Sequence, residues 1–342
     1  MRRTSRPSGC SAWRPRRSRS RPWIRPRTIR PLPRRCAPRW RRWVWPRTRS
    51  IRRRRTRRPA AVRCPGRSRR LSTSSFTAAL APAAAIDVVF APGDIQGKVH
   101  AFSRLLTKPD GPAVISCSWG GFESAYRDQD VTAMESLFAE AAARDVTLCF
   151  ASGDRGDGSA TYGGPSGRPE VFYPGSSPYV VGCGGTTLDP GGSKEEISWS
   201  EPMGKSLLAS GGGLSSRFER PAWQGEELPQ GGGRWVPDVA AKADLRGGYR
   251  IVVGGVEASM GGTSAASPLW GALVALCNQA LAAAGHGPVG YLTPHLYPIP
   301  AGATRDITEG SNGSYAAGKG WDAVTGWGSP EGEALLEVLL GG

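Results

Sequence analysis

The stretch AVISCSWGGFESAYRDQDVTAMESLFAEAAARDVTLCFASGD, residues 113–154, decides the fold. Its first part, 113–121, is a short apolar and β-branched run that ends in glycine, which is typical of a buried parallel strand. Residues 130–145 have the spacing of an amphipathic helix, and 146–154 form a second apolar run that breaks at a glycine. Strand, helix and strand in succession predict an α/β protein with a doubly wound parallel sheet flanked by helices.

The flanking sequence continues this alternation. AIDVVFAP (85–92) is typical of a strand, KVHAFSRLLTK (98–108) of a helix, and PYVVGCGGTTL (178–188) of a third buried strand. GGTSAASPLWGALVALCNQALAAAG (261–285) begins as a tight turn and becomes a long apolar helix. In sheets of this kind, the active groups are expected where strands end and loops begin.

Charge divides the 342-residue chain into two parts of opposite character. Residues 1–70 contain 28 Arg and no Lys, Asp or Glu, so the other 272 residues, with 17 basic and 28 acidic side chains, carry −11 within the total of +17. Sequence rich in Arg and Pro cannot bury a core, and its like charges repel one another. We therefore expect a disordered segment over 1–70 and a folded domain over 71–342.

The composition disfavours several classes of protein. No run of about 18 apolar residues lacks Gly, Pro or a charge, which argues against a membrane span, and the arginine-rich start does not have the pattern of a secretory signal. The seven cysteines form no CxxC pair, so the sequence gives no support for a zinc site. The last four, Cys117, Cys149, Cys183 and Cys277, are expected to be buried thiols.

The heptapeptide GTSAASP (262–268) places Ser264 among small residues at the start of the long apolar helix. Glycine allows a tight turn there, and the free amides at a helix N-terminus favour developing negative charge. Ser264 is therefore a candidate nucleophile, and a helix cap without chemistry is the alternative. His100, His286 and His295 have ordinary surface or packing settings, which argues against a Ser-His-Asp triad.

Taken together, these motifs resemble those of the sedolisins, which are serine-carboxyl peptidases with a subtilisin-like fold. The resemblance covers roughly residues 69–342. It rests on eight blocks that occur in the family's order: ALAPAAAIDVVFAP, VISCSWGG, SGDRGDG, YPGSSPYVVGCGGTTL, SGGGLSSRFERPAWQ, VPDVAAKAD, GGTSAASPLWGALVA and RDIT…YAAGKGWDAVTGWGSP. It implies a serine-type endopeptidase that hydrolyses peptide bonds in acid.

The resemblance also implies roles for individual residues. Ser264 matches the nucleophile, and Asp154 in SGD matches the aspartic acid of the oxyanion hole. A carboxyl group must be protonated to donate a hydrogen bond to an oxyanion, which burial and acid favour. Read alone, Asp154 is equally typical of a turn. Trp119 matches the Trp of SWGG beside the catalytic carboxylates, and core packing is the alternative for it.

In the family that the chain resembles, the general base is a Glu-x-x-x-Asp pair on one helix face, just before ALAP. Counting back from Ala79–Pro82 puts the Glu at Arg69 and the Asp at Thr73, so neither carboxylate is present. One hypothesis is that residues 1–77 are translated out of frame, because codons can be chosen for Ser68–Phe76 that read Glu-Ala-Ala-Leu-Asp two bases later. The alternatives are an inactive pseudo-peptidase and a genuine basic arm, whose binding to nucleic acid would fall with salt.

The C-terminal block resembles the calcium site of the family. Asp306 and Asp322 would supply side-chain oxygens to one Ca²⁺ ion, and Ile307, Gly318 and Gly320 would supply backbone carbonyls. An ordinary loop rich in Gly and Asp is the alternative. The resemblance further implies polypeptide substrates, a monomer and an extracellular location, with no membrane or nucleic-acid partner. It also implies that the sheet lacks its N-terminal part and has an exposed edge.

Overall fold

A computed structural model describes residues 67–159, 168–188, 195–204, 206–253, 255–297 and 299–341. All described residues belong to one compact unit, Val62–Gly342, which is called the second unit because it follows Met1–Ala61 in the chain. The expectation of disorder over 1–70 therefore concerns a segment that lies, apart from residues 67–70, outside the described residues.

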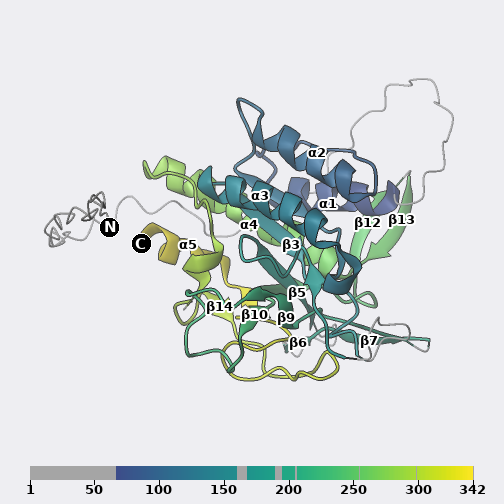
Figure 1. The fold of residues 1–342 in the computed structure, drawn as a ribbon. Coiled ribbons are helices and arrows are strands. Elements are labelled where there is room, and N and C mark those ends of the chain that lie inside the picture. Colours follow the sequence, from purple (N-terminus) through teal and green to yellow (C-terminus); the bar gives the residue numbers. More distant parts are fainter. Residues whose placement is uncertain are drawn as a thin grey trace, which may run out of the picture. The chain divides into compact units, whose positions relative to one another are not determined.

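A parallel sheet forms the centre of the second unit. Its strands follow the order β1 (Val114–Cys117), β3 (Thr147–Ala151), β5 (Val181–Leu188) and β11 (Val239–Lys242), with β6 (Glu196–Ser198) antiparallel to the end of β5 (Figure 1). In β3, Leu148 and Phe150 pack on one side of the sheet and Cys149 packs on the other, as strand alternation requires. The strand order and the buried faces confirm the predicted doubly wound α/β fold.

The central helix α4 (Thr263–Ala283) packs against all four parallel strands, and α1 (Arg67–Leu80) lies along it (Figure 1). Trp270 is fully buried in α4, and its indole Nε1 donates a hydrogen bond of 2.9 Å to the carbonyl oxygen of Ala240 in β11. Among the described residues, α4 is the one helix long and apolar enough to cross a membrane, but 56% of that stretch is buried inside the protein. Its apolar character is therefore that of a core helix.

Two further helices cover the other face of the sheet. α2 (Ile95–Leu106) begins at Asp94, whose Oδ1 accepts a hydrogen bond of 2.7 Å from the amide of Gly97. α3 (Asp128–Ala143) packs against α2. Between them, Phe102, Phe138 and Phe150 form a buried aromatic cluster with ring centroids 5.3, 5.4 and 5.8 Å apart. Such burial of apolar surface stabilises this layer of the fold.

Shorter strands, turns and one helix surround this core. They are the antiparallel two-stranded pairs β2 (Gly121–Phe122) with β4 (Phe172–Tyr173), β7 (Ser200–Met203) with β8 (Ser206–Ala209), β9 (Gly213–Glu219) with β10 (Gly233–Val236), β12 (Tyr249–Val253) with β13 (Val256–Met260) and β14 (Thr304–Arg305) with β15 (Ser329–Pro330), the 3₁₀ turns Glu123–Ala125 and Thr293–Leu296, and the last helix α5 (Gly332–Gly341). α5 packs against α4 and β14.

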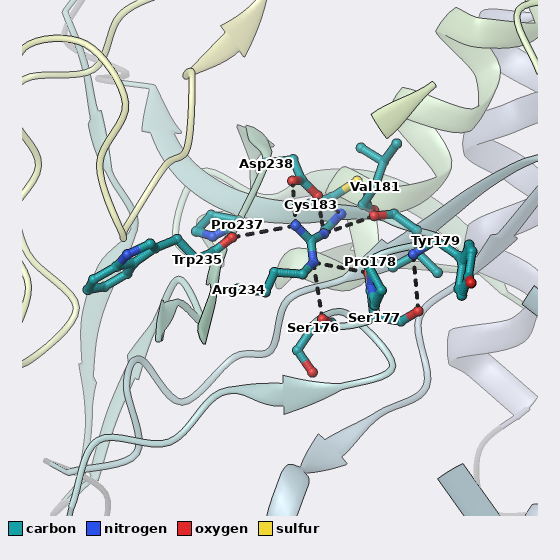
Figure 2. Close-up of polar contacts among 12 residues, drawn as sticks. Ser176, Ser177, Pro178, Tyr179, Val181, Cys183, Arg234, Trp235, Pro237 and Asp238 are labelled. Atoms are coloured by element: carbon teal, nitrogen blue, oxygen red, sulfur yellow. Dashed lines mark hydrogen bonds and ion pairs between the residues drawn. The ribbon is translucent and has the colours of Figure 1, made fainter. Parts of the chain in front are cut away.

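A buried ion pair links Arg234 in β10 to Asp238, which lies just before β11 (Figure 2). Arg234 and Asp238 are both fully buried, and the guanidinium donates hydrogen bonds of 3.0 and 2.8 Å to the two carboxylate oxygens. The same guanidinium donates to the carbonyl oxygens of Ser176, Ser177 and Val180 at 3.0–3.1 Å. Burial of these charges is tolerated because each is both paired and hydrogen-bonded.

The strand predicted over 85–92 is absent from the structure. Ile86, Val88 and Phe90 in this segment are 37–61% exposed. A strand is stable only with a hydrogen-bonded neighbour, and β1, the first strand of the sheet, pairs only with β3 among the described residues. The apolar pattern of 85–92 therefore predicts a strand for which the described structure supplies no partner. The buried-thiol prediction is confirmed for Cys149, Cys183 and Cys277, whereas Cys117 is half-buried, and all four are free.

Candidate active site

Ser264 occupies the first turn of α4, where two glycines bring the chain in from β13. Gly262 has φ of +87°, and a Cβ atom added there would lie 2.8 Å from Oδ2 of Asp154. Only glycine meets both conditions without strain, which explains the small residues before the serine. Ser264 is half-buried, and among the described residues its hydroxyl has no hydrogen-bond partner. The predicted nucleophile therefore lies at a helix N-terminus with an available hydroxyl.

Asp154 lies in the loop that follows β3 and reaches the same helix terminus. Its Oδ1 accepts hydrogen bonds from the backbone amide of Thr263 at 2.7 Å and from the Thr263 hydroxyl at 2.8 Å. The amide of Gly153 donates to the same hydroxyl oxygen at 3.2 Å. The structure thus brings Asp154 to the residue next to Ser264, although the two lie far apart in the sequence. The bond to the Thr263 amide is also a helix-capping contact, which α4 otherwise lacks.

The backbone of Ser264 is held from the opposite side by the segment after β1. Pro268 has no N–H, so the carbonyl oxygen of Ser264 receives no helical hydrogen bond from it. The hydroxyl of Ser118 donates to that oxygen at 2.9 Å instead. One turn further, the hydroxyls of Ser116 and Ser267 lie 2.8 Å apart. The SWGG segment and the start of α4 are therefore joined by side-chain hydrogen bonds.

No base for Ser264 is found among the described residues. His100, His286 and His295 are exposed, as expected for surface histidines. The positions where the family's carboxylate pair is expected, Arg69 and Thr73, fall in α1, which packs along α4. A helix does occupy the expected place, but the side chains of residues 67–73 lie outside the description. Trp119, expected beside these carboxylates, is 45% exposed and so is not a core residue.

The predicted calcium ligands lie together in the loop between β14 and β15. Asp306 Oδ2 accepts a hydrogen bond of 2.9 Å from the amide of Gly320, and Asp322 Oδ2 accepts one of 3.2 Å from the amide of Gly318. Both carboxylates therefore point at the same short stretch of backbone. The neighbouring Ile307 has a buried side chain, so only its backbone is available as a ligand.

The oxygen-only donor set of this loop fits a hard divalent cation such as Ca²⁺. Burial raises the pKa of Asp322 to about 6, although hydrogen bonds from the amides of Thr325, Val324 and Gly318 oppose the shift. A nearby cation would relieve that desolvation cost. Among the described residues, no group of three or more His, Cys, Asp and Glu side chains could hold a metal ion. A site here would accordingly depend on backbone carbonyls as well as on the two carboxylates.

Sequence reasoning misses three residues that shape this site. Thr263 connects Asp154 to the helix, Ser118 holds the carbonyl of Ser264, and Asp157 joins the Asp154 loop to the loop between β14 and β15. For Asp157 a signal exists in SGDRGDG, where a second Asp lies between glycines. For Thr263 and Ser118 no local signal exists, because their partners are distant in the sequence.

Comparison with known proteins agrees with this geometry. A family model described as the subtilase family matches residues 67–328. Kumamolisin from Bacillus sp. (strain MN-32) is 43% identical over 279 residues, which covers 77% of this chain and 49% of kumamolisin. Tripeptidyl-peptidase 1 from Homo sapiens is 34% identical over 264 residues, which covers 67% of this chain and 43% of that protein. The chain thus spans about half the length, or less, of these curated relatives.

A solved structure is also similar to this chain. It is described as Pseudomonas sedolisin, a serine-carboxyl proteinase, complexed with two molecules of pseudo-iodotyrostatin. The TM-score is 0.63 at 31% sequence identity, and the match covers 71% of this chain and 69% of that chain.

Proposed function

The chain belongs to the subtilase family and within it to the sedolisins, and from this premise we propose that it is a serine-carboxyl endopeptidase that hydrolyses polypeptides in acid. The observation that carries the proposal is the junction at Thr263, where the Asp154 carboxyl group meets the residue next to Ser264. A helix N-terminus that presents a hydroxyl beside a carboxyl group is suited to acyl transfer.

In the proposed reaction, Ser264 Oγ attacks the carbonyl carbon of the scissile peptide bond. The Oγ–C bond forms, the carbonyl π electrons move to the oxygen, and the hydroxyl proton passes to a solvent water molecule, because no described side chain beside Ser264 serves as a base. The neutral carboxyl form of Asp154 donates a hydrogen bond to the resulting oxyanion, and the helix N-terminus stabilises the same charge. Collapse of this intermediate expels the amine, which takes up a proton, and water then hydrolyses the acyl-enzyme.

A second candidate function follows from the residues of α1. Arg69 and Thr73 stand where the family's two carboxylates are expected, so the chain as written has no group there that accepts the Ser264 proton. We therefore keep a non-catalytic pseudo-peptidase as the alternative. It would retain the fold and the Asp154 contact but would not turn over substrate.

We also propose that the loop between β14 and β15 binds one Ca²⁺ ion. Asp306 and Asp322 would supply charged oxygens, and Ile307, Gly318 and Gly320 would supply carbonyls. The ion would supply no chemistry at Ser264 and would stabilise the folded loop between β14 and β15.

A comparison of three proteins separates the two functions. The first is the chain itself, the second is Ser264→Ala, and the third is the double variant Arg69→Glu/Thr73→Asp, each incubated with a denatured protein substrate near pH 4. Cleavage by the chain and its loss in Ser264→Ala establish the peptidase. Cleavage by the double variant alone establishes that this chain is a pseudo-peptidase on a competent scaffold. No cleavage by either the chain or the double variant would remove the peptidase proposal.

A further inference from the structure

The loop that carries Asp154 contains a second carboxylate, Asp157, which is fully buried and has no part in the proposed chemistry. Its Oδ1 accepts hydrogen bonds from the amide of Ser159 at 2.9 Å and from the Ser159 hydroxyl at 2.6 Å. Its Oδ2 accepts one of 2.8 Å from the amide of Ser314, which lies 157 residues away in the loop between β14 and β15. One side chain therefore fastens the Asp154 loop to a distant segment.

The backbone around Asp157 is built for this contact. The Asp157 amide donates to the carbonyl oxygen of Asn312 at 3.2 Å, and the amide of Gly156 donates to the carbonyl oxygen of Ala209 at 3.0 Å. Gly313 has φ of +130°, and a Cβ atom there would lie 2.5 Å from Asp157 Oδ1. Glycine is needed at position 313 because the carboxylate passes directly over the backbone.

The far end of the contact is equally fixed. Asn312 is fully buried, and its Nδ2 donates to the carbonyl oxygens of Gly212 at 3.4 Å and Ala323 at 3.2 Å. Residues 312–314, which Asp157 contacts, are therefore themselves held to the core by hydrogen bonds. A rigid attachment point lets a loop hold a catalytic group within the narrow tolerance that an oxyanion contact requires.

Asp157 serves this contact as an ionised acceptor. Burial raises its pKa, but the hydrogen bonds from Ser159 and Ser314 outweigh burial, and the net pKa lies below the ordinary value for Asp. Hydrogen bonding therefore favours the charged form of Asp157, which accepts from both Ser159 and Ser314.

We propose that Asp157 is a positioning residue that holds the Asp154 carboxyl group in register with Ser264 by fastening the 153–159 loop to residues 312–314. The inference rests on the proposed function, because register between the two groups matters only for acyl transfer. It assigns Asp157 no contact with substrate. Its effect reaches Asp154 through the backbone of the two intervening residues, Arg155 and Gly156.

The test uses a matched pair of ligands, an acetylated tripeptide aldehyde and the corresponding tripeptide alcohol. The Ser264 hydroxyl adds to the aldehyde: the Oγ–C bond forms, the C=O π electrons move to the oxygen, and the hydroxyl proton ends on that oxygen. The hemiacetal oxygen then occupies the oxyanion position, whereas the alcohol reports on peptide binding alone. Because binding is read at equilibrium, the measurement does not need the carboxylate pair missing from α1.

The affinity ratio of aldehyde to alcohol is measured at acid pH for the chain, for Asp157→Asn and for Asp130→Asn. Asp130 is a buried carboxylate in α3 with no described contact to the Asp154 loop, so its variant is the matched control. We expect the ratio to fall about tenfold in Asp157→Asn, with alcohol binding unchanged, and to stay constant in the control. A ratio within about twofold of the parent value, or equal losses for both ligands, overturns the inference.

A milder variant covers the case in which Asp157→Asn does not fold. Ser159→Ala removes the hydroxyl bond of 2.6 Å from an exposed side chain and leaves the buried carboxylate in place. It should lower the ratio in the same direction by a smaller factor, and an unchanged ratio counts against the inference. The proposed function is overturned if the parent chain binds the aldehyde no better than the alcohol and Ser264→Ala changes neither affinity. That result differs from one in which the parent prefers the aldehyde and Asp157→Asn leaves this preference unchanged, which overturns only the inference about Asp157.

Discussion

The hydroxyl of Ser118 takes the place of a missing amide in helix α4, because it donates a 2.9 Å hydrogen bond to the Ser264 carbonyl that Pro268 cannot serve. A proline inside a helix normally leaves such a carbonyl without a protein partner. Here the gap lies at the candidate nucleophile and is filled from the segment after β1. The same hydrogen bond therefore stabilises the helix and fixes the position of Ser264.

Replacing Ser118 with Ala should destabilise the protein by about 1 kcal/mol, because a partly buried carbonyl loses its donor. Ser136→Ala is the matched control, since Ser136 donates a bond of the same length, 2.9 Å, to the carbonyl oxygen of Thr132 on an exposed helix surface. Urea unfolding of both variants measures the difference. If the two variants lose equally little free energy of unfolding, the Ser118 hydrogen bond stabilises the protein no more than an ordinary surface hydrogen bond does.

Asp154→Ala should lower the free energy of unfolding by about 1 kcal/mol, because α4 loses the carboxylate that accepts the Thr263 amide. Asp154→Asn retains a side-chain oxygen and should keep most of that stability. Thermal unfolding of the two variants distinguishes a capping contribution from a general loss of packing. Comparable losses in both variants would contradict the capping interpretation.

Breaking the buried pair of Arg234 and Asp238 should be far more costly. Arg234→Met leaves Asp238 charged and buried, for which a loss of about 3–5 kcal/mol is expected. The control is Arg250→Ala, which removes the exposed ion pair with Glu257 and should change stability by less than about 1 kcal/mol. If Arg234→Met lowers the free energy of unfolding no more than Arg250→Ala does, the expectation that an unpaired buried Asp238 is costly is wrong.

Glu135 should make stability depend on pH near neutrality. Burial raises its pKa from 4.5 to about 7, against opposing hydrogen bonds from Ser177 and Tyr173. Because the folded protein binds this proton more tightly than the unfolded chain, the contribution is complete below pH 4.5 and is lost as pH rises to about 7. The loss amounts to about 3 kcal/mol.

Glu135→Gln remains neutral and should remove this component, so the variant matches the parent near pH 4 and is the more stable protein at pH 8. Glu140→Gln, on the same helix but half-exposed, is the control. Urea unfolding at four pH values between 4 and 8 gives the comparison. A parent and variant that differ equally at every pH would contradict the assignment.

Calcium should raise the unfolding temperature of the chain if the loop between β14 and β15 binds it, because a ligand that binds only the folded state stabilises that state. A chelator should reverse the shift, and Asp306→Asn should abolish it. Magnesium at the same concentration is the control ion, since it holds its water more tightly. A shift that survives in Asp306→Asn would place the ion elsewhere.

The sequence predicts those parts of the fold that local patterns determine. Residues 113–154 contain a strand, a helix and a strand because each segment carries its own apolar period, and the structure confirms all three. The pattern of 85–92 fails for a physical reason, because a strand also needs a neighbour. Local pattern likewise cannot show that Arg234 reaches three carbonyls of a preceding turn, since that contact depends on tertiary packing.

The candidate site, like the fold, can be predicted from the sequence only where its features are local. Ser264 and its glycines are evident in one short stretch, because the turn and the helix start are local features. The pairing of Asp154 with Ser264 is implied only by resemblance to a family, and the roles of Thr263, Ser118 and Asp157 are not implied at all. Each of these contacts joins segments more than 100 residues apart, and the sequence holds no local record of them.

The contact between Thr263 and Asp154 spans 109 residues. Such a contact forms only after the intervening chain has been synthesised and has closed a large loop, and closures of this kind come late in folding. The hydroxyl and the carboxyl group therefore meet only in a molecule that is already assembled. A nascent or partly unfolded chain contains Ser264 and Asp154 but does not bring them together, so the proposed chemistry requires an intact fold.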